Sequence, residues 1–188
     1  MLDQGLARRL RLVGFDVDGV LTDNGLYVGA VGDHPVELKR FHIQDGMGLR
    51  MLREAGLTVV FVSARPSTAT ELRGRELKID EVLQDKQKLP VFEAMLARRG
   101  IAWEETAFVG DDLPDLPLLQ RVALPIAVAN AVPEVKAAAR IVTTHAGGDG
   151  AAREVAELIL RSRGEWQELV TKYFLERGDV ASGHERPR

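Results

Sequence analysis

The chain has 188 residues, a formal net charge of −3 and 45% hydrophobic residues, which is typical of one globular domain. The small negative charge gives no general attraction for nucleic acid or an anionic membrane, and the absence of cysteine excludes disulfides and thiolate metal sites. The first nine residues lack the apolar stretch of a signal peptide, and no run approaches the roughly 20 apolar residues of a membrane helix. We therefore expect a cytoplasmic protein with no nucleic-acid or membrane partner.

Apolar runs alternate with amphipathic segments along the chain. The pattern predicts, in order, a strand at 11–15, hairpin arms at 26–28 and 36–41, a helix at 48–55, a strand at 57–62, a helix at 67–77, a strand at 81–83, a helix at 89–99, a strand at 106–109, a helix at 116–121, a strand at 124–128, a helix at 134–139, a strand at 141–142, and helices at 151–161 and 165–176. This alternation predicts an α/β fold, a Rossmann-like parallel sheet with helices on both faces, in which the hairpin (about 20–41) is a β-hairpin flap. We expect one domain over 1–177 and a polar tail over 178–188.

Polar side chains follow several of the predicted strands. Asp16 and Asp18 follow the first, Ser63 follows the strand at 57–62, and Asp111 follows the strand at 106–109, while Lys88 lies near the start of a helix. The carboxyl ends of parallel strands meet at one edge of a sheet, so these side chains are predicted to gather there. Residues two apart in extended backbone share a face, with Cα atoms roughly 6–7 Å apart. By itself the acid pair could equally be two turn acids after a strand.

This set contains the parts needed to transfer a phosphoryl group through an aspartyl intermediate. Asp16 would attack phosphorus, and Asp18 would protonate the leaving oxygen and then activate water. Mg²⁺ would lie between Asp16, Asp111 and a phosphate oxygen, with the backbone carbonyl of Asp18 as a further ligand. Lys88 would neutralise charge, and Ser63 would donate a hydrogen bond to the phosphoryl group.

The acid pair at 16–18, the hydroxyl at 63, the lysine at 88 and the acid cluster at 110–115 resemble the four motifs of the haloacid dehalogenase superfamily of phosphotransferases. The segments at 16–23, 41–50, 110–115 and 146–154 look more closely like the 3-deoxy-D-manno-octulosonate 8-phosphate phosphatase family. This resemblance implies a Mg²⁺-dependent hydrolase of a small phosphorylated sugar acid in lipopolysaccharide precursor synthesis. It also implies a fold with no cap domain and a homotetramer whose hairpins help to cover the sites.

The resemblance further implies which residues contact the substrate. They are Asp18, His42, Ile43, Gln44, Asp45, Gly46, Arg50, Arg65, Arg73 and Lys88. Bidentate pairing of an arginine with the sugar carboxylate would be chemically reasonable.

The sequence departs from the family where Ala64 and Asp85 replace glycines, and the stretch from Gln84 to Lys88 is one residue shorter. Lys86 is therefore an alternative to Lys88 as the motif lysine. Asp112 and Asp115 are expected to orient the metal's water or Lys88 rather than to bind the metal. The glycine-rich segment at 147–150 is either an anion site or a turn.

Three other functions remain open at this point. One is a phosphatase of a nine-carbon keto-sugar acid 9-phosphate, because the motifs act on phosphate and not on sugar length. The second is a non-catalytic scaffold of the same fold, and the third is a signalling receiver domain. The last two are disfavoured by the intact Asp16 and Asp18 and by the acid cluster at 110–115.

Overall fold

The structure is a computed structural model that describes residues 2–177. Its sheet has six strands in the order β5-β4-β1-β6-β7-β8, and every neighbouring pair is parallel. The strands are β1 (Leu12–Asp16), β4 (Thr58–Ser63), β5 (Glu81–Gln84), β6 (Thr106–Gly110), β7 (Leu124–Ala127) and β8 (Ile141–Val142). The predicted α/β parallel-sheet fold is thus confirmed.

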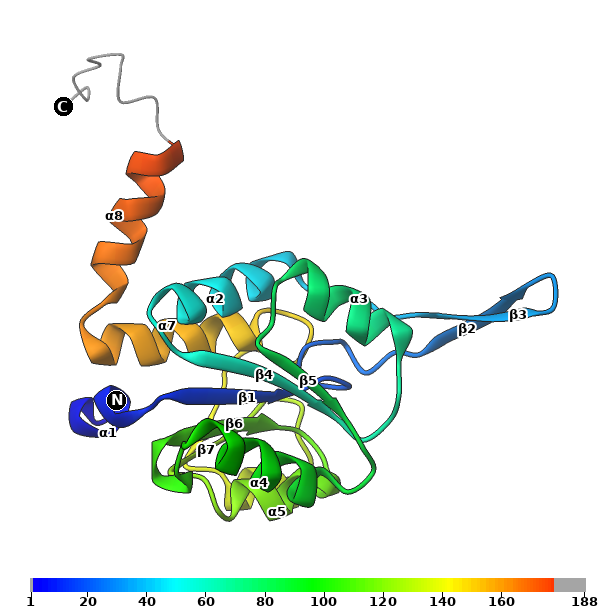
Figure 1. Cartoon of the computed structure of the whole chain (residues 1–188), viewed down its shortest axis with the longest axis horizontal. Coiled ribbons are helices and arrows are strands. Elements are labelled where there is room, and N and C mark those ends of the chain that lie inside the picture. Colours follow the sequence, from blue (N-terminus) through cyan, green and yellow to red (C-terminus); the bar gives the residue numbers. More distant parts are fainter. Residues whose placement is uncertain (1, 178–188) are drawn as a thin grey trace.

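Helices cover both faces of this sheet (Figure 1). One face carries α2 (Ile43–Glu54), α3 (Thr68–Glu76) and α7 (Ala151–Arg163), and the other carries α4 (Lys88–Arg99) and α5 (Leu116–Leu119). The remaining helices are α1 (Gln4–Arg9), α6 (Pro133–Ala138) and α8 (Trp166–Arg177), with short 3-10 turns η1 (Trp103–Glu105) and η2 (Leu113–Asp115). None of the helices in residues 2–177 combines the length and apolar character that crossing a membrane requires.

The core lies between the sheet and its helices. Every residue of β1 and β6 is buried, as expected for apolar runs covered on both faces. Phe92 of α4 meets Phe108 of β6 edge-on, with ring centroids 5.8 Å apart, and Phe15 and Phe61 are fully buried in neighbouring strands. The strand ends that carry the polar side chains are therefore held by a closely packed core.

A two-stranded hairpin leaves this body between β1 and α2. Its strands are β2 (Tyr27–Val31) and β3 (His34–Leu38), which pair antiparallel and extend away from the sheet (Figure 1). Within the described residues, the hairpin and α2 are the only regular elements between β1 and β4. The described part of the chain thus has the expected flap and no cap domain.

Two helices differ from the expectations. Helix α1 was not predicted, and it begins where the Asp3 side chain accepts the Leu6 N–H. Helix α2 was predicted from residue 48 but begins at Ile43. The low helix propensity of Gly46 and Gly48 argues against a helix there. Packing against α7 nevertheless stabilises the helix. A Cβ atom on Gly48 would lie 3.0 Å from Cα of Arg153 in α7, so the glycine permits close contact between the two helices.

The strand order explains where the candidate catalytic residues lie on the sheet. From β1 the chain continues to β4 and β5 on one side of the sheet, and to β6, β7 and β8 on the other. Ligands of such sheets bind at the carboxyl ends of the strands where the order reverses. Asp16 ends β1 between the ends of β4 and β6, so the reversal lies at the first acid of the pair.

The glycine-rich segment before α7 supports the turn that follows β1. A Cβ atom on Gly147 would overlap the carbonyl oxygen of Gly19, and one on Gly148 would overlap the backbone of Asp23. Asn130 links the two loops, because its Oδ1 accepts the Gly147 N–H at 2.7 Å and its Nδ2 donates to the Gly19 carbonyl at 3.3 Å. In the structure the segment at 147–150 is a turn that packs against the backbone of Gly19 and Asp23.

Replacing Gly147 with alanine should therefore lower stability. The overlap forces the loop at residue 19 to shift, and overpacking of this kind costs about 1–3 kcal/mol, or roughly 2–4 °C in Tm per kcal/mol for a domain of this size. Thermal unfolding would measure the loss. Gly29→Ala is the matched control, because nothing lies within 4 Å of its added Cβ atom. Equal Tm values for the two variants would contradict the close packing.

Candidate active site

Three carboxylates meet at the carboxyl ends of β1 and β6. Asp16, Asp111 and Asp115 are each at most 5% exposed, and each offers an oxygen within 4.8 Å of the others. Lys88, the first residue of α4, reaches into this cluster from the other side. Its ammonium donates to Asp16 Oδ1 at 2.5 Å and to Asp115 Oδ1 at 2.7 Å. The fold has thus brought four buried charges from three separate segments to one point.

The charges in this cluster are unbalanced. Burial, together with the charge of Asp115, raises the pKa of Asp16 well above its ordinary range, and the same two causes raise the pKa of Asp111 to about 6. Burial acts to lower the pKa of Lys88, but the charges of Asp16 and Asp115 outweigh it and the pKa is raised. One ammonium cannot neutralise three carboxylates, so the cluster favours a further cation.

The oxygens of the cluster fit Mg²⁺. Asp111 Oδ1 is buried and has no hydrogen-bond partner, so it can take a cation. Asp115 is already satisfied, because Oδ1 accepts from Lys88 and Oδ2 accepts the N–H groups of Asp111 and Asp112 at 3.0 and 3.4 Å. Asp16 and Asp111 therefore supply carboxylate oxygens of the kind that this hard ion prefers, and Asp115 orients Lys88 and the loop at 111–112.

Glycine is required beside Asp111. Gly19 follows Asp18 with a φ of +94°, a backbone conformation that disfavours other residues. A Cβ atom there would also overlap the carboxylate of Asp111. The glycine therefore allows the turn after β1 to lie against the carboxylate of the β6 loop.

Asp18 has a different environment from Asp16. Its side chain is 30% exposed, and its Oδ2 lies 3.5 Å from Ser63 Oγ at the end of β4 and 3.5 Å from Arg65 Nε. Ser63 is 1% exposed and also donates to the Arg65 carbonyl at 3.0 Å. Asp18 is therefore accessible to solvent, whereas Asp16 is enclosed. Metal contact through the Asp18 carbonyl and phosphate contact by Ser63 stay predictions.

The three predicted substrate arginines do not gather at one place. Arg65 lies at the cluster, where it pairs with Asp18. Arg73 on α3 is 11% exposed, pairs with Glu76 and stacks over the Phe41 ring at 5.7 Å. Arg50 on α2 pairs with Glu54 and stacks on Tyr173 of α8. Of the three, Arg65 contacts the acid pair, through Asp18, and substrate contact by all three remains a prediction.

The predicted substrate segment at 42–46 forms the start of α2. Asp45 is 2% exposed, and its Oδ1 accepts the Arg153 N–H at 2.8 Å, which caps α7. Burial raises its pKa. His42 and Gln44 line a cavity of about 630 Å³ beside α7, whereas Ile43 is 78% exposed and Gly46 packs against Arg73. Contact of these residues with a substrate also stays a prediction.

Sequence reasoning missed three polar residues near the acids. Glu37 and Lys39 reach Arg65 and Asp18 from the second arm of the hairpin. The alternation of apolar and charged residues along 36–39 would have placed these two on one face. Asn130 follows β7, and the rule of strand carboxyl ends that identified Asp111 applies equally to it.

This geometry defines a class of enzyme. A parallel α/β sheet with an acid pair after the first strand, a hydroxyl, a lysine and an acid cluster is the arrangement of a haloacid dehalogenase-like hydrolase. The model of that family matches residues 82–155.

Individual relatives narrow the assignment. The chain is 40% identical over 163 residues to 3-deoxy-D-manno-octulosonate 8-phosphate phosphatase of Escherichia coli K12, covering 86% of this chain and 85% of that protein. A crystal structure of the Moraxella catarrhalis phosphatase with magnesium ion, phosphate ion and KDO matches with a TM-score of 0.85 and 32% identity, over 90% of this chain and 97% of that one. The cobalt-bound Haemophilus influenzae phosphatase matches with a TM-score of 0.78 and 34% identity, over 85% and 92%. The chain belongs to the 3-deoxy-D-manno-octulosonate 8-phosphate phosphatase family.

The structure places Lys88, and not the exposed Lys86, in the acid cluster. Lys88→Met should leave Asp16 and Asp115 buried without their cation, a change that typically costs about 3–5 kcal/mol. We expect a lower free energy of urea unfolding and loss of p-nitrophenyl phosphate hydrolysis. Lys86→Met is the matched control and should change neither. The reverse pattern would make Lys86 the motif lysine.

Proposed function

We propose that this protein hydrolyses 3-deoxy-D-manno-octulosonate 8-phosphate to 3-deoxy-D-manno-octulosonate and phosphate, as a Mg²⁺-dependent phosphomonoesterase of lipopolysaccharide precursor synthesis. The observation that carries the proposal is the buried Asp16, held by Lys88 beside Asp111. Further support comes from the 40% identity to a phosphatase named for this reaction. The similar Moraxella structure holds magnesium, phosphate and KDO together.

Asp16 is suited to be the nucleophile. Lys88 holds its Oδ1 and leaves the other oxygen for attack on phosphorus, which forms the Asp16–phosphorus bond and breaks the bond to the sugar oxygen. A bound Mg²⁺ supplies positive charge that offsets the repulsion between the dianionic ester and the carboxylate. Ser63 donates a hydrogen bond to a phosphoryl oxygen as negative charge shifts during the reaction.

Asp18 handles the protons of both steps. In the first step its carboxyl gives a proton to the departing sugar oxygen, so the product leaves as an alcohol. In the second step the resulting carboxylate takes a proton from the water that attacks the phosphorylated Asp16, which releases phosphate and restores the enzyme. The 30% exposure of the Asp18 side chain supports this role, because the leaving oxygen and water must both reach it.

A groove between β3 and α3 is suited to the sugar acid. It has a volume of about 860 Å³ and is lined in part by Glu37, Ser67 and Arg73. Arg65 lies beside Asp18 and pairs with Glu37, which lines this groove. Guanidinium groups recognise carboxylates through paired hydrogen bonds, so we propose that these arginines select the acid function of the substrate.

Steady-state hydrolysis would test this function. We expect the eight-carbon ester to have a higher kcat/KM than a nonulosonate 9-phosphate, no turnover after EDTA treatment, and recovery on addition of MgCl₂. Asp16→Asn should lower kcat on the order of 10³-fold or more, because it removes the nucleophile. Glu134→Gln, at an exposed position on α6, is the control and should keep wild-type rates.

Three outcomes would contradict the proposal. Faster hydrolysis of the nine-carbon ester would assign the other substrate. A folded protein that hydrolyses no phosphate ester with Mg²⁺ would be a scaffold. Unchanged turnover by Asp16→Asn would exclude the nucleophile.

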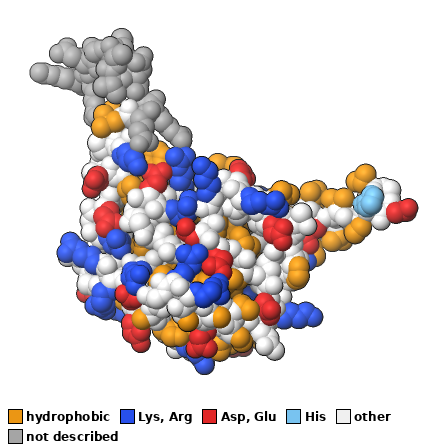
Figure 2. Space-filling model, viewed as in Figure 1, with side chains coloured by type: hydrophobic (Ala, Val, Ile, Leu, Met, Phe, Trp, Pro, Cys, Tyr) orange, Lys and Arg blue, Asp and Glu red, His pale blue; other side chains and the backbone are white. Residues whose placement is uncertain are grey.

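We also propose that the protein is a homotetramer in which hairpins of neighbouring subunits pack together and help to cover the sites. Apolar side chains lie along the hairpin (Figure 2), with Tyr27 58%, Val28 74%, Val31 71% and Leu38 63% exposed. A lone two-stranded ribbon is marginally stable in water, so burial of these side chains between copies supports the assembly. The cytoplasmic location stays a prediction from the sequence.

Light scattering coupled to gel filtration would test the assembly. Wild-type protein should elute with the mass of about four chains, and Val28→Asp with Val31→Asp should yield smaller species, because buried carboxylates are costly. Val142→Asp, on the exposed part of β8 at the far edge of the sheet, should retain the wild-type mass. A monomeric wild-type protein would contradict the proposal.

A further inference from the structure

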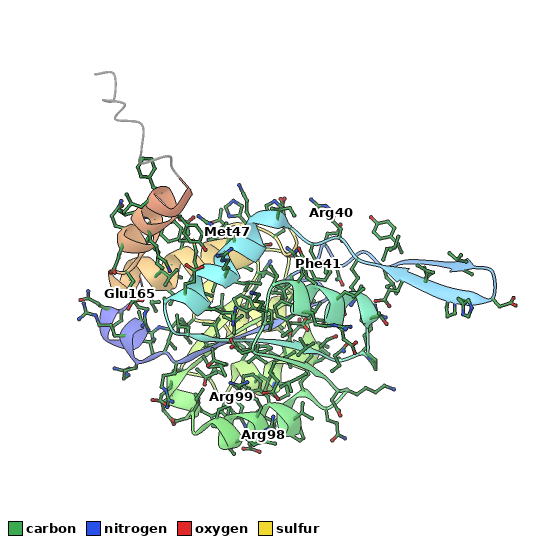
Figure 3. The ribbon with its side chains drawn as sticks, turned by 45° about the horizontal axis from the view of Figure 1, so that its top comes forward. Arg40, Phe41, Met47, Arg98, Arg99 and Glu165 are labelled. Atoms are coloured by element: carbon green, nitrogen blue, oxygen red, sulfur yellow. The ribbon has the colours of Figure 1, made fainter. Side chains whose placement is uncertain are left out.

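The second arm of the hairpin returns a lysine to the acid pair. Lys39 follows β3 directly, and its Nζ lies 2.7 Å from Asp18 Oδ1. The same ammonium donates to Thr70 Oγ1 of α3 at 3.3 Å and lies 3.8 Å from Glu37 Oε1. Figure 3 shows the next two residues, Arg40 and Phe41, at the base of the hairpin. Lys39 thus joins the hairpin, α3 and the acid pair at one atom.

The Lys39 side chain is not available to bind a substrate. It is 0% exposed, although the strand that precedes it is largely open to solvent. A buried ammonium is stable only where oxygen atoms replace its water, and here the oxygens of Asp18, Thr70 and Glu37 do so. The charge is therefore directed at protein atoms and away from solvent.

Glu37 holds this arrangement from the other side. Its Oε1 accepts a hydrogen bond from Ser67 Oγ at 2.5 Å, and its Oε2 lies 3.0 Å from Arg65 Nη2. Ser67 is the residue that caps α3, so the hairpin is attached both to that helix and to the loop after β4. Lys39 consequently occupies a defined position relative to the sheet edge.

The two oxygens of Asp18 are held very differently. Oδ1 has a close charged partner in Lys39, whereas both neighbours of Oδ2, Ser63 Oγ and Arg65 Nε, are 3.5 Å away. Hydrogen bonds to carboxylates normally measure about 2.7–2.9 Å, so Oδ2 is held only loosely. Lys39 therefore fixes the orientation of the carboxyl group and leaves Oδ2 for proton transfer.

We propose that Lys39 is a positioning residue that holds Oδ1 of Asp18 and so aims Oδ2 at the oxygen of the leaving group. This inference rests on the proposed phosphatase function and extends it, since it makes the hairpin part of the proton-transfer machinery of its own subunit. Lys39 acts through Asp18 and contacts neither the phosphoryl group nor the sugar.

Two substrates that differ in leaving group would test this role. The measured quantity is kcat/KM, which covers the steps up to departure of the leaving group and so leaves out the later attack of water. The sugar oxygen of 3-deoxy-D-manno-octulosonate 8-phosphate needs a proton to leave, whereas the p-nitrophenolate of p-nitrophenyl phosphate does not. A misplaced Asp18 should therefore impair only the first substrate.

We expect Lys39→Met to lower kcat/KM for the sugar ester by about 100-fold, which is the lower end of the contribution of general acid catalysis. For p-nitrophenyl phosphate, whose leaving group needs no proton, kcat/KM should fall by less than about threefold. Lys39→Arg retains the charge and should recover most of the loss. Lys136→Met on α6, which removes a partly exposed lysine elsewhere, should match wild type on both esters.

Several results would overturn the inference. Equal losses on both esters, with a lowered Tm, would make Lys39 a structural residue. A rise in KM for the sugar ester at unchanged kcat would make it a substrate contact, and full activity on both esters would exclude any role. If the wild-type protein hydrolyses glucose 6-phosphate but not the octulosonate ester, only the proposed function is contradicted. The role of Lys39 is then tested by comparing glucose 6-phosphate with p-nitrophenyl phosphate.

Discussion

Asp16, Asp111 and Asp115 place their carboxylates within 4.8 Å of one another where little water can reach them. Two like charges about 4 Å apart repel by about 4 kcal/mol at an effective dielectric constant of 20. Lys88 offsets part of this repulsion through Asp16 and Asp115, and the remaining negative charge suits the site to a further cation such as Mg²⁺. The same unbalanced charge that would destabilise an ordinary core suits the site to bind a cation and, in the function that we propose, a phosphate ester.

The two acids after β1 have different surroundings, and this difference underlies the different tasks that we propose for them. Asp16 is enclosed and its Oδ1 is held by Lys88, which suits a nucleophile that must meet phosphorus at one angle. Asp18 lies past the strand end, is 30% exposed, and is held by Lys39 from the hairpin. In the function that we propose, the buried carboxylate forms the bond to phosphorus and the solvent-accessible one, two residues away, transfers the protons.

Much of the fold could be predicted because strand and helix patterns are local. The prediction succeeded where long apolar runs or strong breakers define an element, as for the strand at 57–62 and for the helix that ends at Gly100. It was wrong at the start of α2, where two glycines argue against a helix that contact with α7 nevertheless stabilises. It favoured Lys88 as the motif lysine and kept Lys86 as an alternative, since the pattern does not show where α4 begins.

The sequence by itself determined the α/β class and the identity of the candidate catalytic residues, because residue types and their order after each strand are properties of the chain. It also carried the family resemblance in full. Only the tertiary structure decided which of these groups meet. Asp45 caps α7, Arg50 stacks on Tyr173 of α8, and Lys39 at the base of the hairpin pairs with Asp18. Such contacts join segments far apart in the chain, so they depend on how the elements pack and not on local pattern.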